Sequence, residues 1–98
     1  MENHWSSKTV QIGSIRRNKK IVITFQALPT IPEVIDLIAQ CGCTKLDYNA
    51  ETRKLQVTYN SGEIPKQIHG NQIIDKSITV VYKGGEKDTL SIKGIKLR

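Results

Sequence analysis

Residues 21–59 constrain the fold most, because several independent local signals agree there. Residues 21–25 are β-branched and apolar, which predicts a buried strand. Residues 44–49 predict a second strand. In residues 55–59, apolar and polar side chains alternate, which predicts a third strand in a sheet with one buried face.

The segment between the first two of these strands predicts an α-helix that would cover the sheet. Thr30 and Glu33 have the spacing of a capping box, in which each side chain satisfies the other residue's backbone N–H. Pro32 falls in the first turn, where its missing N–H costs little, and Gly42 is placed to end the helix. Apolar residues recur at the spacing of one helical face: Ile31, Val34, Ile35, Ile38 and Ala39.

The remaining segments extend this pattern at both ends of the chain. Residues 9–15 predict a strand that turns through a basic hairpin into the next strand. Residues 63–70 predict either a short helix or an ordered loop. Residues 77–82 and 89–98 predict the last two strands, the final one with a bend or bulge at Gly94.

We therefore predict an α+β fold with a ferredoxin-like β-α-β-β-α-β core and an extra N-terminal and C-terminal β-strand. Such a core forms an antiparallel sheet with helices on one face. Residues 1–8 are expected to be a flexible lead-in, and residues 9–98 a single α+β domain. The single tryptophan, Trp5, is expected to dock on that domain.

Residues 21–82 resemble the heavy-metal-associated domains of copper chaperones and metal-transporting ATPases. The resemblance depends on the strand 21–25, the predicted helix after Leu28, and a hairpin whose second strand ends in Tyr59. It implies a ferredoxin-like fold. Members of that family hold their metal on two cysteines, two residues apart, in the loop before the first helix, whereas residues 27–33 contain no cysteine. The resemblance therefore implies a fold and not a metal-binding function.

The chain has a formal net charge of +6, and this charge is unevenly distributed. Residues 31–63 contain three basic and five acidic residues, so the two flanks hold an excess of eight positive charges. A basic surface formed by the chain ends favours an anionic partner; alternatively, the excess lysine only keeps a small protein in solution. The candidate anion-binding residues lie in the basic turn and in the last strand: Arg16, Arg17, Lys19, Lys20, Lys93, Lys96 and Arg98.

The two cysteines, Cys41 and Cys43, are expected to stay reduced, because two residues so close together do not form a disulfide framework. As thiolates they could hold a soft ion such as Cu(I) or Zn²⁺, with His4 or His69 as further ligands. The alternative is that at least one cysteine is buried as a small apolar side chain. We favour no metal and no cofactor, and keep the cysteine pair as the alternative metal site.

No catalytic set and no glycine-rich phosphate loop before a helix occurs, so the chain is not expected to be an enzyme. We expect non-catalytic binding of an anionic partner, either a nucleic acid or an acidic protein surface. The alternatives are a protein-interaction or assembly module that pairs an exposed β edge, including a homodimer, and a metal-handling domain.

Tyr48, Tyr59 and Tyr82 are candidates for base stacking, although packing is their favoured role. Because no apolar run is long enough for a membrane span or a signal peptide, a cytoplasmic location without membrane contact is expected.

Overall fold

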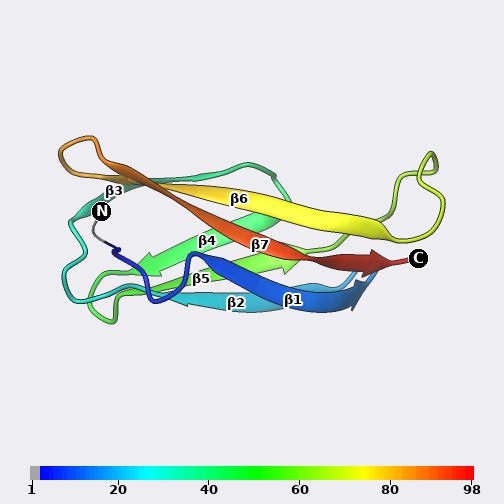
Figure 1. Cartoon of the computed structure of the whole chain (residues 1–98), viewed down its shortest axis with the longest axis horizontal. Helices are drawn as coiled ribbons and strands as arrows, with labels where there is room; N and C mark the ends of the chain where they lie inside the picture. The colour runs from blue at the N-terminus through cyan, green and yellow to red at the C-terminus, as the bar shows by residue number, and fades with distance from the viewer. Residues whose placement is uncertain (1–2) are drawn as a thin grey trace.

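The computed structural model describes residues 3–98 and shows two β-sheets packed face to face in a sandwich of 44 × 22 × 22 Å (Figure 1). The strands are β1 (Thr9–Arg16), β2 (Lys20–Gln26), β3 (Val34–Ala39), β4 (Thr44–Asn49), β5 (Lys54–Asn60), β6 (Gln72–Tyr82) and β7 (Lys87–Leu97). One sheet has the order β1-β7-β6-β3 and the other the order β2-β5-β4. All neighbouring strands are antiparallel except β1 and β7, which are parallel. Across residues 3–98, no helix is long and apolar enough to cross a membrane.

The predicted α+β ferredoxin-like fold is wrong, because the segment predicted as the main helix forms strand β3. Its pairing with β6 shifts register between Val34 and Asp36, which is a β-bulge. The bulge allows Val34 and Leu37, three residues apart, both to pack against the core. The same spacing in the sequence resembles one face of a helix. Because this segment is rich in β-branched residues, it suits a strand as well.

The second predicted helix is also absent: residues 63–70 form an irregular loop between β5 and β6, in which the Ile68 N–H donates to the Pro65 carbonyl at 3.0 Å. Of the two predicted alternatives, the ordered loop is therefore correct. With no helix in the described part of the chain, each sheet covers the apolar face of the other. The fold implied by the resemblance to heavy-metal-associated domains is wrong for the same reason.

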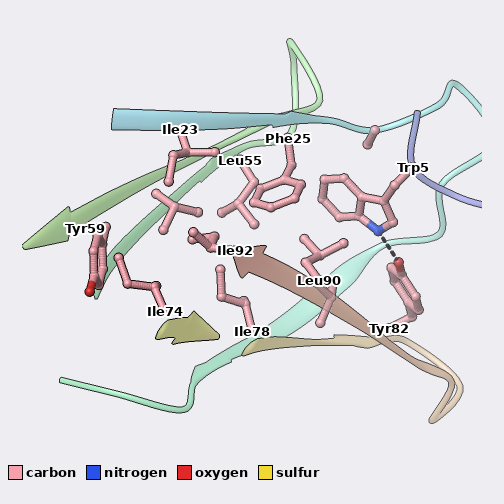
Figure 2. Packing of buried hydrophobic residues seen from close by; sticks show 13 residues of the cluster. Trp5, Ile23, Phe25, Leu55, Tyr59, Ile74, Ile78, Tyr82, Leu90 and Ile92 are labelled. Atoms are coloured by element: carbon pink, nitrogen blue, oxygen red, sulfur yellow. Dashed lines mark hydrogen bonds between the residues drawn. The ribbon is translucent and has the colours of Figure 1, made fainter. Parts of the chain in front are cut away.

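The core lies between the inner faces of the two sheets (Figure 2). Its largest fully buried side chains come from both sheets and from the N-terminal segment: Trp5, Tyr59, Tyr82, Phe25, Leu55, Ile78, Leu90, Ile92, Val57 and Val80. Alternation explains this burial in β5, where every second residue faces the opposite sheet.

Trp5 closes one end of this core. Its indole Nε1–H donates to the Tyr82 hydroxyl at 2.7 Å, and its ring meets Phe25 edge to face, with centroids 6.5 Å apart (Figure 2). A bridge to Ala27 ties the segment to the end of β2. The expected docking of Trp5 is thus confirmed. Met1 and Glu2, which belong to the predicted lead-in, lie outside the described residues.

Gly94 in β7 pairs with Gly13, directly beside the bulge in β1. A Cβ at this position would be 2.6 Å from the Gly13 carbonyl oxygen and 2.6 Å from Ile12 Cγ1. We expect Gly94→Ala to lower the free energy of unfolding by about 2–3 kcal/mol, because the backbone must shift. Urea unfolding monitored by circular dichroism measures this change. Gly42→Ala, where a Cβ would meet nothing within 4 Å, should change stability by less than about 0.5 kcal/mol; equal effects of the two variants would contradict the close approach.

Candidate anion-binding site

Residues 16–20 carry the chain from one sheet to the other (Figure 1). The predicted hairpin between residues 9–15 and the next strand is wrong, because β1 pairs with β7 and β2 pairs with β5. Asn18 lies at the tip with φ of 56°, in the left-handed region that asparagine tolerates. The residues beside it are all basic, and we call residues 16–20 the basic corner.

Ser61, directly after β5, holds the basic corner in place. Its hydroxyl donates to the Arg16 carbonyl at 2.6 Å and accepts the Lys19 N–H at 2.9 Å. Two backbone hydrogen bonds reinforce this contact, from Asn18 to the Gly62 carbonyl at 2.9 Å and from Ser61 to the Lys19 carbonyl at 2.8 Å. Because Ser61 is buried, these hydrogen bonds fix the backbone from which the basic side chains extend.

A cleft of about 230 Å³ adjoins the basic corner. It is lined by Arg16, Arg17, Asn18, Lys19, Glu63, Leu97 and Arg98. Its volume is several times the roughly 30 Å³ that one water molecule occupies in the liquid, so a phosphate group fits. Four of the seven predicted anion-binding residues therefore meet at one place.

Glu63 is the single acidic residue of this cleft. Its carboxylate accepts a hydrogen bond from the Asn18 side-chain amide and lies 3.6 Å from Arg17 Nη1. This carboxylate balances one of the four positive charges. Within residues 3–98, neither Arg16 nor Lys19 forms an ion pair, so a net positive charge faces the cleft.

Arg98, which follows β7, forms one wall of the cleft by bracing the β5–β6 loop. Its guanidinium donates to the carbonyls of Gly70 at 3.1 Å, Pro65 at 3.4 Å, and Ile68. Its backbone N–H donates to the Asn71 side-chain oxygen at 3.0 Å. Carbonyl partners do not neutralise the guanidinium, so Arg98 adds charge to the cleft while holding the loop.

The other three predicted residues lie elsewhere. Lys20 borders a second cleft beside Cys43, and Lys93 is exposed on the outer face of the four-stranded sheet. Lys96 is 7% exposed and faces inward, where its Nζ donates to the Glu63 carbonyl at 3.1 Å. Burial lowers the pKa of Lys96 below its usual value, the charge of Lys76 lowers it further, and Glu63 offsets part of this shift.

The cysteines are not reduced as expected: Cys41 and Cys43 are joined by a disulfide bond. The physical reason is the tight turn between β3 and β4, which brings the two sulfurs together although one residue separates them. In this form the sulfurs are not thiolates, so the metal-handling alternative stays a prediction for the reduced chain only. Within residues 3–98, no group of three or more histidine, cysteine or acidic side chains is arranged to hold a metal ion.

Two residues of the site were missed from the sequence, namely Ser61 and Glu63. The only signal for them was the break in the pattern at residues 60–62, which predicts a turn but not its contact with residues 16–20.

Among the tyrosines, Tyr59 and Tyr82 are buried in the core. Burial raises the pKa of both hydroxyls, and neither ring is available to stack on a base.

Comparison of the chain with protein-family models, curated proteins and solved structures finds no match. The functional assignment therefore rests on the geometry and charge of the cleft.

Ser61→Ala is expected to lower the free energy of unfolding by about 1–3 kcal/mol, because the Lys19 N–H and the Arg16 carbonyl lose a buried partner. It should also speed hydrogen exchange at the Lys19 amide. Urea unfolding and amide exchange measured by NMR check these results. Ser14→Ala, at an exposed position of β1, is the control. Unchanged exchange at Lys19 in Ser61→Ala would show that Ser61 does not hold the corner.

Proposed function

We propose that the chain is a small non-catalytic binding module whose basic corner holds phosphate groups of a nucleic-acid backbone. The observation that supports this most is the convergence of Arg16, Lys19 and Arg98 on one cleft. These residues are the last residue of β1, the residue before β2 and the residue after β7, respectively. The proposal includes the cytoplasmic location expected from the sequence.

The charge of the cleft favours an anionic ligand. Like charges held this close together repel one another, and Glu63 offsets only part of that repulsion. A bound phosphate would offset the remaining repulsion between the basic side chains, and its binding would release counterions from the nucleic acid. Basic residues that only aid solubility have no need to converge on a cleft, since scattered charges serve that purpose equally well.

The side chains at the cleft suit the nucleic-acid backbone better than the bases. Arginine, lysine and asparagine donate hydrogen bonds to phosphate oxygens, and such contacts read no sequence. Tyr59 and Tyr82 are buried and do not form a stacking platform. We therefore expect binding with little sequence preference.

The test is a fluorescence anisotropy titration of labelled single- and double-stranded oligonucleotides with the wild-type chain. Three or four phosphate contacts predict that affinity for a duplex falls about 40- to 150-fold between about 50 mM and about 200 mM salt. Poly-glutamate is the competing ligand. If it binds as tightly as the oligonucleotide, the corner recognises acidic protein surfaces instead. Absence of binding to either ligand at low salt would mean that the charge serves solubility alone.

A second candidate function is pairing of the β3 edge with a partner strand or a second copy of the chain. Strand β3 ends the four-stranded sheet, and no lysine or proline lies within it to block edge pairing. Ile35 and Ile38 on this strand are 59% and 50% exposed. Sedimentation velocity at high salt tests this function. A dimer that Ile38→Lys dissociates would support it, whereas a monomer at all concentrations would exclude self-pairing.

A further inference from the structure

The Cys41–Cys43 disulfide lies in the turn between β3 and β4, where the chain passes from one sheet to the other. Both cysteines are partly exposed. A cleft of about 300 Å³, separate from the anion-binding cleft, reaches one of the two sulfur-bearing residues, Cys43. It is lined by Lys20, Gly42, Cys43, Lys45, Thr58, Asn60 and Gly62.

Two exposed lysines give this second cleft a positive charge. Lys20 lies opposite Asn60 in the β2–β5 ladder, and Lys45 lies opposite Thr58 in the β4–β5 ladder. The Asn60 N–H donates to the Cys43 carbonyl at 2.9 Å, which places Cys43 beside β5 at the same end of the sheet as the two lysines. Within the described residues, neither lysine forms an ion pair. A negatively charged molecule that approaches Cys43 through this cleft is therefore attracted.

The two sulfurs differ in their surroundings. The Cys43 backbone N–H donates to Cys41 Sγ at 3.1 Å. A hydrogen bond to sulfur stabilises a thiolate, so Cys41 is the better leaving group when the disulfide is attacked. The Thr44 N–H and hydroxyl both donate to the Cys41 carbonyl, at 3.3 and 3.0 Å. These bonds hold the turn closed and keep the two sulfurs adjacent after reduction.

We propose that the Cys41–Cys43 disulfide is a thiol–disulfide exchange site for thiols that carry carboxylate groups. The incoming thiolate attacks Cys43 Sγ, a new sulfur–sulfur bond forms there, and the Cys41–Cys43 bond breaks. The electron pair of the broken bond stays on Cys41, which leaves as a thiolate. If the partner is a dithiol, its second thiolate attacks the mixed disulfide and releases Cys43. The partner is then oxidised to a disulfide, and the protein gains two electrons and, on protonation, two protons.

The first test measures the rate of reduction by three dithiols: dihydrolipoate, which is anionic, dithiothreitol, which is neutral, and dithiobutylamine, which is cationic. Rates are compared per thiolate at low salt, with acid quenching, alkylation and intact mass as the readout. We expect the anionic dithiol to react about 5- to 10-fold faster than the cationic one, because of attraction by two lysines. Equal rates would overturn the proposal.

Substitution of the two lysines tests whether the second cleft causes the preference for the anionic dithiol. Lys20→Gln/Lys45→Gln should remove most of the preference for the anionic dithiol. Lys54→Gln/Lys87→Gln is the matched control, since it removes two charges at exposed positions that do not line this cleft. Brief reaction with mercaptoacetate, followed by quenching and tandem mass spectrometry, locates the mixed disulfide. The adduct is expected on Cys43; an adduct mainly on Cys41, or a preference that survives Lys20→Gln/Lys45→Gln, would refute the proposed geometry.

Discussion

Replacement of Arg16 and Lys19 by glutamate is expected to lower the affinity for a duplex oligonucleotide about 100-fold at low salt. The salt dependence should also become shallower, its log–log slope changing by about two, because two phosphate contacts are lost. Both side chains line the cleft, and within residues 3–98 neither has an acidic partner that the change would disturb. Anisotropy titrations at several salt concentrations measure both quantities.

The matched control is Lys54→Glu/Lys87→Glu, which changes the net charge by the same amount. Lys54 begins β5 and Lys87 begins β7, whereas β7 ends at Leu97, which lines the cleft, and β5 is followed by Ser61, which contacts the basic corner. This variant is expected to lose less than about 10-fold in affinity, since distant charges are screened by salt. If both double variants lost affinity equally, binding would depend on net charge and not on the basic corner.

Trp5→Ala is expected to lower the free energy of unfolding by about 3–5 kcal/mol. The indole is fully buried, and its loss would leave a cavity beside Phe25. It would also remove the hydrogen bond to the Tyr82 hydroxyl, which itself donates to Asp88 at 2.7 Å. Domains of this size are stable by only about 5–15 kcal/mol. The variant should therefore unfold at much lower urea concentration, as monitored by far-ultraviolet circular dichroism.

Trp5→Phe separates the two contributions, because it keeps most of the apolar ring but loses the indole N–H. It is expected to cost about 1–3 kcal/mol, because the buried Tyr82 hydroxyl loses one of its two hydrogen bonds and the ring becomes smaller. Tyr82→Phe completes a double-mutant cycle for the hydrogen bond. A loss below about 1 kcal/mol for Trp5→Ala would contradict the packing of this segment in the core.

Most strands could be predicted from the sequence, because alternation and β-branched residues determine them locally. Strand β4 has the predicted bounds, Thr44–Asn49. The helix prediction failed at β3, where a bulge after Val34 produces a helical spacing in a strand. The sequence pattern within a strand shows which face is buried, but it does not determine which other strand that strand pairs with. The parallel pairing of β1 with β7 joins residues about as far apart as the chain allows, and no signal in either strand indicates it.

The candidate site was predictable in part for the same reason. The basic residues 16–20 stand out in the sequence, and Asn18 has the left-handed conformation that its residue type allows. The contribution of Arg98 depends on the end of β7 lying beside β1, which is a property of the tertiary fold. The sequence predicted Lys96 as an anion-binding residue of the last strand, but alternation along β7 turns its side chain inward. The contact between Ser61 and Lys19 likewise becomes apparent only once β2 pairs with β5.

The most direct test of the central claim, that the basic corner is the anion-binding site, is an NMR titration of the ¹⁵N-labelled chain with a short duplex. A chain of 11.0 kDa gives resolved amide spectra. Our account predicts that the perturbed amides cluster at residues 16–20, at residues 61–63 and at Arg98, and that added salt reverses the shifts. Perturbations centred on the outer face of either sheet, or shifts that salt does not reverse, would contradict it.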